Sequence, residues 1–299
     1  MAGLAILCIV FQSLALTQCE SNETGEPLKK AILWKITGET LNQPSYLFGS
    51  IHLLDSADFF LHKTVIEQLR RSDVLVLETN MDEPGYQQAA LQQAMMEEDS
   101  LSGLLDTAAY REINDFFMDR YNIPLKALDK MKPFYVASMI SALSADASTK
   151  SHETEFIRIA HEEDKPVRGI ATIKTESEIL GGIPMDVQVK YLLKEIEKNK
   201  EGSQEEKKEK LFDAYNQGDL VKIESLMMES VGAFPEIHNA MFIRRNQVWI
   251  PLMENMMIEE SCFFVTGVGH LPGESGIIKL LREEGYNVRP VKMDFWFHD

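Results

Sequence analysis

The sequence is poor in cysteine, which excludes a fold held together by disulfides. Its 299 residues contain three cysteines, and two of them, Cys8 and Cys19, stand close to the N-terminus. The third, Cys262, lies in an apolar run that reads as a strand, so we expect a buried thiol there and no nucleophile. No Cys-x-x-Cys pair occurs, and metal sites built on such a pair are therefore excluded.

Positive charge and long apolar runs are also scarce. The formal net charge of −17 at pH 7 argues against general nucleic-acid binding and against docking on anionic lipid, and it suits cations or basic peptides. The N-terminal apolar run from Leu4 to Leu16 is short for a membrane span and typical of a signal peptide. We expect a signal peptide at residues 1–19, with a lipoprotein signal ending at Cys19 as the alternative, and no transmembrane span. The protein is then secreted, periplasmic or lipid-anchored at the cell envelope.

The common catalytic signatures are missing too, since the sequence has no His-Glu-x-x-His, no Gly-x-Ser-x-Gly and no Walker loop. What it does have is a repeated pattern in which an apolar strand runs into Gly-x-x-His, at Gly49–His52 and again at Gly267–His270. Glycine permits a tight turn at a strand end, and active-site groups of open α/β sheets gather beyond the strand ends. The two histidines are predicted to meet if their strands lie near each other in one sheet.

Each Gly-x-x-His is followed by a helical pattern and a further strand, at 61–71 and 73–79 and then at 276–284 and 286–291. Amphipathic helical patterns fill most of residues 85–255 between the two copies. We therefore predict an α/β fold, α+β by content, with a central mixed sheet built from two similar N- and C-terminal halves and a large helical insert. One domain is expected at 31–291, with a flexible N-terminus at 20–30 and a C-terminal tail at 292–299.

A carboxylate and an arginine complete the candidate site. Glu78 ends the strand at 73–79, and a right-handed strand–helix–strand crossover places it at the same sheet edge as His52. Two histidines and one carboxylate suit a catalytic divalent metal that keeps open positions for water and substrate. Glu78 is either a ligand or a general base. Arg245 is predicted to steady an oxyanion or the substrate, with Asn246 fixing that arginine or the substrate.

Each of these residues also has a structural interpretation. A histidine after a strand often serves as a cap, Glu78 suits a helix N-terminus, and Arg245 suits pairing with Glu254 or Glu259. Glu274, soon after the second Gly-x-x-His, is either a further ligand or a charge at a helix start. The remaining histidines are expected at the surface: His62, His152, His161, His238 and His298.

Three blocks of the chain resemble the TraB/PrgY/GumN family, which includes the metazoan Wnt-inactivating TIKI proteases. The blocks are Tyr46–His52 with Asp55 and Ser72–Glu78, then Arg245-Asn246 with Trp249, and Val265–Gly276 with Leu280-Leu281 and Gly285–Val288. The resemblance spans Ala31 to Val291. It implies a metal-dependent peptidase with His52, Glu78 and His270 in the active site, manganese or cobalt as the ion, and a peptide or protein substrate. Zinc is the alternative ion.

One departure from the family pattern concerns the middle strand, where Gly169-Ile170-Ala171 stands in place of a common Gly-Leu-Glu. The resemblance then implies a changed pocket or partner surface, while the three metal residues remain. Predicted substrate contacts within the resembling blocks are Ser50, Asp55, Gly269 and Glu274. The alternatives to a metallopeptidase are a non-catalytic binder of peptide, haem or metal in the same cleft and an esterase-like hydrolase of a small molecule. The sequence leaves open whether the protein forms a homodimer.

Overall fold

The computed structural model describes residues 30–144, 149–202 and 204–293. The predictions for residues 1–19, and for nearly all of 20–30 and 292–299, fall outside the described residues. No helix in the described ranges combines the length and the apolar character that crossing a bilayer requires.

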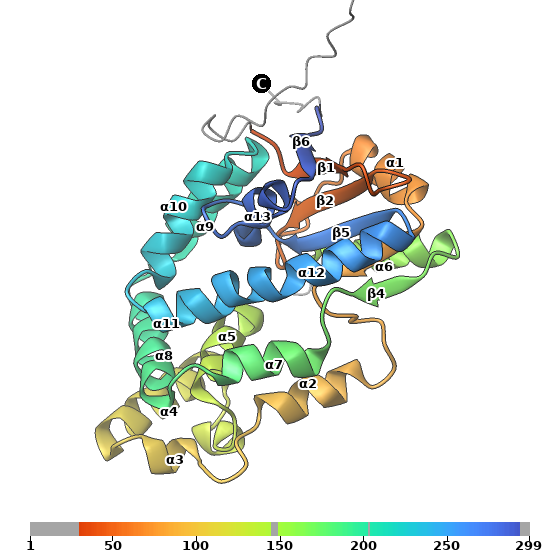
Figure 1. Cartoon of the computed structure of the whole chain (residues 1–299). Coiled ribbons are helices and arrows are strands. Elements are labelled where there is room, and N and C mark those ends of the chain that lie inside the picture. The colour runs from red at the N-terminus through yellow and green to blue at the C-terminus, as the bar shows by residue number, and fades with distance from the viewer. Residues whose placement is uncertain (1–29, 145–148, 203, 294–299) are drawn as a thin grey trace, which may run out of the picture.

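A mixed six-stranded sheet lies at the centre of the described chain (Figure 1). Its strands follow the order β4-β3-β5-β2-β1-β6, with bounds β1 Leu33–Thr37, β2 Ser45–Ser50, β3 Val74–Leu77, β4 Val167–Gly169, β5 Cys262–Gly267 and β6 Asn287–Pro290. The strands from β4 to β2 run parallel, whereas β1 pairs antiparallel with both of its neighbours. Because β2 and β5 are parallel neighbours, both Gly-x-x-His turns leave the sheet at one edge.

The two halves of the chain repeat one connection, as the sequence predicted. In the first half β2 leads through α1 (Lys63–Arg71) to the parallel strand β3, and in the second β5 leads through η3 (Val268–His270) and α13 (Ile277–Glu283) to β6. Gly285 follows α13 with a φ of 91°, a left-handed conformation that glycine adopts without strain and that ends helices. Figure 1 shows α12 and α13 in front of the sheet and α1 and α6 behind it.

The predicted helical insert occupies the chain between β3 and β5, interrupted by β4. Before β4 it comprises α2 Tyr86–Ala94, α3 Leu101–Leu104, α4 Thr107–Tyr121, η1 Leu125–Leu128, α5 Pro133–Leu143 and α6 His152–Glu162. After β4 come α7 Ile173–Gly181, α8 Met185–Lys200, α9 Gln204–Asn216, α10 Leu220–Val231, α11 Pro235–His238, the π-helical turn η2 Asn239–Ile243, and α12 Arg244–Glu259. In Figure 1 the helices α2 to α5, α7 and α8 extend away from the sheet, and α12 lies between them and β5.

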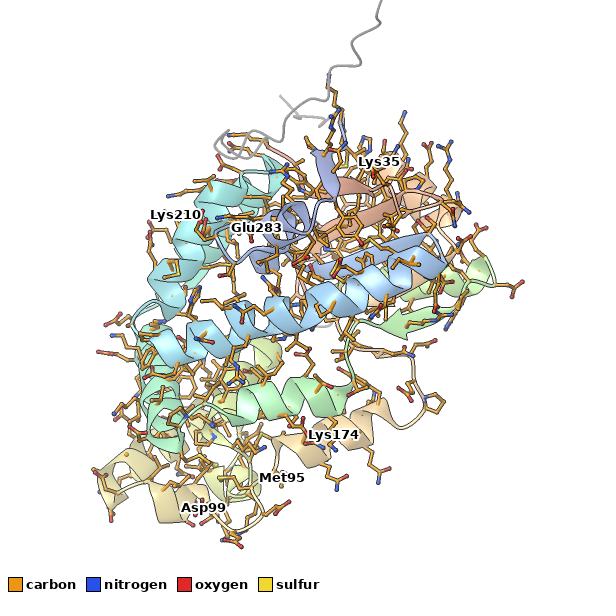
Figure 2. The ribbon with its side chains drawn as sticks, in the orientation of Figure 1. Lys35, Met95, Asp99, Lys174, Lys210 and Glu283 are labelled. Atoms are coloured by element: carbon orange, nitrogen blue, oxygen red, sulfur yellow. The ribbon has the colours of Figure 1, made fainter. Side chains whose placement is uncertain are left out.

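Burial explains why these segments fold as they do. Every residue of β2 and β3 is buried, as expected of parallel strands covered on both faces. A second apolar core joins α4, α5 and α8 through side chains such as Phe117, Val136 and Leu192. The helix α9 is rich in charge, and its Lys210 projects outward and lies 2.6 Å from Glu206 (Figure 2). The fold therefore leaves one edge of the sheet, where β2, β3, β4 and β5 end, beside the helical insert.

Candidate active site at the strand ends

The three predicted metal residues meet around Gly267, at the end of β5. A Cβ atom added to Gly267 would lie 3.1 Å from Nε2 of His52, 3.4 Å from Oε1 of Glu78 and 3.7 Å from Cδ2 of His270. Only glycine leaves this space free. The expectation that both Gly-x-x-His turns and Glu78 meet at one sheet edge is confirmed.

The Glu78 carboxylate is held from two sides. Its Oε1 accepts a 2.7 Å hydrogen bond from the backbone N–H of Gly267, and its Oε2 accepts one of 2.6 Å from Arg245. Nε2 of His270 lies 3.8 Å from Oε1. Burial alone raises the pKa of Glu78, but the charge of Arg245 and the nearby histidines outweigh burial and hold this pKa far below its usual range. Glu78 is therefore a carboxylate anion at neutral pH.

His270 is oriented by Asn246, the second residue of the Arg-Asn pair on α12. Nδ1 of His270 lies 2.7 Å from Oδ1 of Asn246, whose Nδ2 donates to the backbone oxygens of His270 and Ser275 at 3.1 and 2.7 Å. The Trp249 ring lies 4.5 Å from the imidazole. Burial lowers the pKa of His270 to about 3, so the ring is neutral. Since an amide oxygen only accepts, Nδ1 carries the proton and Nε2 keeps its lone pair.

His52 is oriented by Glu153, a residue that the sequence analysis missed. Nδ1 of His52 lies 2.8 Å from Oε1 of Glu153, and the hydroxyls of Ser50 and Ser151 donate to the same carboxylate at 2.5 and 2.6 Å. Desolvation of the ring edge that faces the protein disfavours the charged form, but the hydrogen bond and the charge of Glu153 outweigh it and raise the pKa of His52 to about 9. Burial raises the pKa of Glu153, yet His52 and the two hydroxyls bring it down to about 2. Because 60% of the His52 side chain is exposed, water screens part of this pairing.

The start of α6 explains why Glu153 was missed. His152, the first residue of α6, was expected at the surface, but its side chain is 1% exposed, so the surface prediction was wrong. Ser151 is the N-cap, and a capping serine followed by an acid in the first turn was the available signal. His62 was also expected at the surface, but it is largely buried as the N-cap of α1.

Arg245 stands at the start of α12, directly after the π-helical turn η2. Its NH1 lies 3.2 Å from Nε2 of His270, and its Nε donates to Glu176 of α7, a buried carboxylate that the sequence analysis also missed. Oε1 of Glu176 accepts from the indole N–H of Trp249 at 2.7 Å, and the guanidinium lies 4.5 Å from the Trp249 ring. Pi-helical turns often occur at functional sites. Arg245 therefore joins the carboxylates of Glu78 and Glu176 to the imidazole of His270.

Two predicted substrate contacts lie within the wall of the site. Ser50 is 1% exposed, with its hydroxyl committed to Glu153. Gly269 packs against Met227 and Phe242, where an added Cβ would clash. Ala171, the departure from the family pattern, is also close, because its N–H donates to the backbone oxygen of Glu78 at 3.1 Å.

The other two predicted substrate contacts lie at the surface. Asp55 is exposed in the loop after His52, where its Oδ1 accepts from the N–H of Ala57 at 3.1 Å. The side chain of Glu274 is 90% exposed and pairs with Lys279. The Glu274 carboxylate thus pairs with Lys279 and, within the described chain, has no contact with Glu78 or the two histidines. Asp55 lies in the loop that follows His52.

The donor chemistry of the site fits a divalent transition metal. Two imidazoles, each held through Nδ1 by a side-chain oxygen, direct Nε2 toward a carboxylate, as in sites where a second layer of groups orients metal-binding histidines. No three His, Cys, Asp or Glu side chains of the described chain are placed to bind one ion together. Arg245 occupies Oε2 of Glu78 and Nε2 of His270. Metal binding by His270 therefore requires Arg245 to leave that nitrogen.

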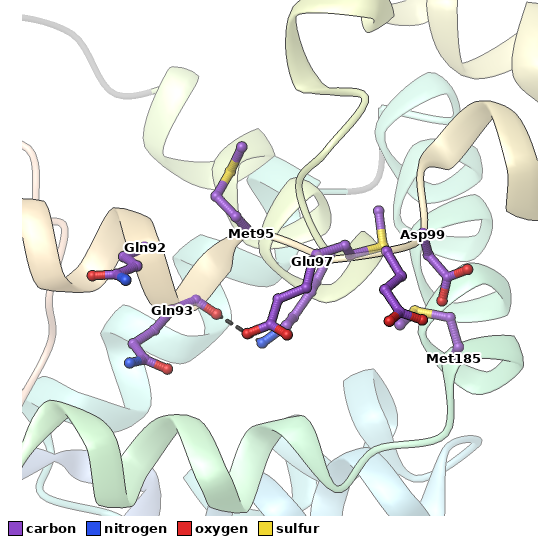
Figure 3. Close-up of a pocket in the computed structure, with 9 residues that line it drawn as sticks. Gln92, Gln93, Met95, Glu97, Asp99 and Met185 are labelled. Carbon is purple, nitrogen blue, oxygen red and sulfur yellow. Dashed lines mark hydrogen bonds between the residues drawn. The ribbon is translucent and has the colours of Figure 1, made fainter.

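A separate cavity of about 450 Å³ lies beside the C-terminal end of α2 (Figure 3). It is lined by Gln92, Gln93, Met95, Met96, Glu97, Glu98, Asp99, Lys132 and Met185. Lys132, one of these lining residues, donates to the backbone oxygen of Gln93 at 2.8 Å. This cavity shares no residue with the site at the strand ends, so it does not contribute to the candidate chemistry.

Comparison with known proteins gives one match. The family model described as the TraB/PrgY/gumN family matches residues 32–290, which is most of the chain and includes every residue of the site. No curated protein and no solved structure matches the chain significantly.

Proposed function

The chain belongs to the TraB/PrgY/gumN family, and from this premise we propose that it is a metal-dependent hydrolase, a metallopeptidase that cleaves an extracellular or envelope peptide or protein. The observation that carries the proposal is the convergence of two oriented imidazoles on the Glu78 anion around Gly267. In this proposal His52 and His270 bind the ion, with manganese or cobalt preferred and zinc as the alternative. The N-terminal apolar run supports a secreted, periplasmic or lipid-anchored location.

The chain's own groups prepare this chemistry before any ion binds. A bound divalent cation supplies a polarised carbonyl and a more acidic water. Asn246 keeps the His270 ring neutral and aligned, so that its lone pair needs no reorganisation. Glu153 aligns the His52 ring through Nδ1 but favours its protonated form, so His52 must lose its Nε2 proton to become a ligand.

Glu78 and Arg245 act beside the reacting carbonyl. Glu78 is a ligand or the base that takes a proton from the attacking water, and its anionic state at neutral pH suits both roles. Arg245 is anchored by Glu176 and Trp249, so its guanidinium stays near the site after leaving Nε2 of His270. From there it stabilises the oxyanion that forms when water adds to the carbonyl.

The test is a cleavage assay with the metal content controlled. Purified protein is stripped of metal, refilled with manganese, cobalt or zinc, and incubated with a peptide library that is read by mass spectrometry. His52→Ala, Glu78→Ala and His270→Ala are assayed in parallel, with the exposed His161→Ala as the matched control. We expect multiple turnovers that require metal, persist in the control and disappear in the three site variants.

The same assay separates the alternatives. An esterase-like hydrolase of a small molecule would use the same site and differ from the metallopeptidase only in its substrate. Cleavage of activated esters with peptides left intact would establish the esterase and contradict the metallopeptidase. Binding of peptide, haem or metal without any turnover would establish a non-catalytic binder.

A further inference from the structure

The loop between β2 and α1 is fixed in place, although it is long and irregular. It begins at Ile51 and His52, and its two sides are tied to the segment before α6. Leu54 and Lys150 exchange backbone hydrogen bonds of 2.9 and 2.8 Å, and the Phe59 ring lies 5.3 Å from Nζ of Lys150. On the inner side, Nδ1 of His152 lies 3.2 and 3.1 Å from the backbone nitrogen and oxygen of Ile51. The loop is therefore a firm rim beside the site.

This rim presents two large apolar side chains to solvent. Leu53, directly after His52, is 45% exposed, and Phe60 at the other end of the loop is 67% exposed. The neighbouring residues Leu54 and Phe59 turn inward instead: Leu54 is buried, and the Phe59 ring packs against the ring of His152. Single exposed apolar residues are common, but two on one anchored loop that starts at a candidate metal ligand indicate a contact surface.

In the sequence of the loop, two carboxylates stand between the two apolar residues. Asp55 and Asp58 are both exposed, and a turn joins them, since the N–H of Asp58 donates to the backbone oxygen of Asp55 at 3.0 Å. The chain as a whole carries a net charge of −17. A ligand of this rim therefore meets apolar surface and negative charge together.

We propose that the rim at Leu53–Phe60 binds a basic amphipathic segment of the peptide substrate, in which apolar side chains alternate with lysine or arginine. The apolar side chains of this segment pack on Leu53 and Phe60, and its cations lie beside Asp55 and Asp58. The proposal rests on the hydrolase function and defines its substrate class. The net charge of −17 argues against other occupants, because it disfavours the approach of a second copy of this acidic chain and of an anionic lipid surface.

The test measures binding without cleavage, on metal-free protein and with fluorescence anisotropy. The probes are three labelled peptides of D-amino acids with one length: alternating Leu and Lys, alternating Leu and Glu, and alternating Ser and Lys. We expect the Leu/Lys peptide to bind at least tenfold more tightly than either of the others. The double variant Leu53→Ser/Phe60→Ser should weaken its binding about tenfold. Asp55→Asn/Asp58→Asn should weaken it about threefold to tenfold in low salt, with little effect at 1 M salt.

Matched controls are the double variants Val221→Ser/Ile258→Ser, whose apolar side chains are 55% and 49% exposed on α10 and α12, and Glu254→Gln/Glu259→Gln on α12. Equal binding by rim and control variants would overturn the proposal. The proposal would also be overturned if the wild type dimerised, or bound anionic vesicles, and the Leu53→Ser/Phe60→Ser variant lost that property. Intact, rim-dependent binding with no cleavage under any metal would contradict the hydrolase and leave the rim as a peptide-binding site.

Discussion

The Nδ1 atom of His52 lies 2.8 Å from the carboxylate of Glu153, a residue 101 positions away in the chain and 5% exposed. Two serine hydroxyls satisfy the rest of that carboxylate. This contact fixes the edge of the imidazole that faces the protein and leaves Nε2 toward Gly267 and Glu78. His270 is held in the same way by Asn246, so both Gly-x-x-His histidines reach the site with one nitrogen already committed.

Removing the Glu153 carboxylate should weaken metal binding. We expect Glu153→Gln to lower the affinity for manganese about tenfold to one hundredfold, since groups that orient metal-binding histidines contribute this much. Isothermal titration calorimetry measures the affinity. Glu155→Gln, a change on the same helix at a carboxylate that pairs with Arg158, is the control and should bind as the wild type does. Equal affinities in the two variants would show that Glu153 has no orienting role.

Asn246 should contribute to stability as well as to orientation. Its amide makes three hydrogen bonds while buried, so Asn246→Ala leaves buried partners unpaired. The expected loss in the free energy of unfolding is about 2–3 kcal/mol, measured by urea denaturation. Gln247→Ala, at an exposed neighbour, should cost under about 0.5 kcal/mol. A similar small loss in both variants would contradict the assigned network.

The coupling between His52 and Glu153 should depend on pH in both directions. The pKa of His52 is raised from 6.5 to about 9, so its contribution is complete below pH 6.5 and is lost as the pH rises toward 9. The pKa of Glu153 is lowered from 4.5 to about 2, so its contribution is complete above pH 4.5 and is lost as the pH falls toward 2. A double-mutant cycle with His52→Ala and Glu153→Gln should give about 1 kcal/mol of coupling at pH 5.5, because exposure of His52 limits it, and close to none at pH 9.5. A pH-independent coupling would refute an ionic pair.

Metal affinity should rise with pH for a related reason. At neutral pH His52 carries a proton on Nε2, which must leave before that nitrogen can bind an ion. Below pH 9 we expect the dissociation constant for manganese to fall about tenfold per pH unit, with one proton released per ion. Calorimetry in buffers of different ionisation enthalpy counts that proton. Binding without proton release would remove His52 from the set of ligands.

Arg245 should matter for turnover more than for metal binding. Arg245→Lys keeps the positive charge but cannot contact Glu78, Glu176 and His270 at once. We expect kcat to fall about 10²- to 10³-fold, while manganese affinity stays the same or rises, because Nε2 of His270 is released. Arg244→Lys, on the exposed side of the same turn, is the control. A loss of affinity equal to the loss of kcat would assign Arg245 to metal binding instead.

The sequence predicted the part of this site that lies on strand ends. Glycine before each histidine and the apolar run before Glu78 are local patterns, and the parallel pairing of β2 with β5 then brings them together. The order strand, helix, strand at both ends of the chain and the helical character of the insert followed equally from the residue pattern. These features were predictable because each depends on residues within one element and on the geometry of parallel sheets.

The partners of these residues could not be predicted in the same way. Glu153 and Glu176 lie on helices of the insert. The capping serine before Glu153 indicates a helix start, but no local pattern shows that either acid is buried. Their roles arise only when α6 and α7 pack beside the sheet edge and bury them to 5% and 6% exposure. Burial of a carboxylate requires a partner, so the packing defined the pairs with His52 and Arg245 that sequence spacing left open.

The most direct test of the central claim is the metal stoichiometry of the purified protein. Metal-stripped wild type is dialysed against micromolar manganese or cobalt and its bound metal is counted by mass spectrometry, beside His52→Ala, His270→Ala and the control His161→Ala. The account predicts one ion per chain in the wild type and the control, and a strong reduction in both site variants. A folded wild type that retains no manganese, cobalt or zinc, or that retains as much in His52→Ala and His270→Ala, would contradict the metal site at the strand ends.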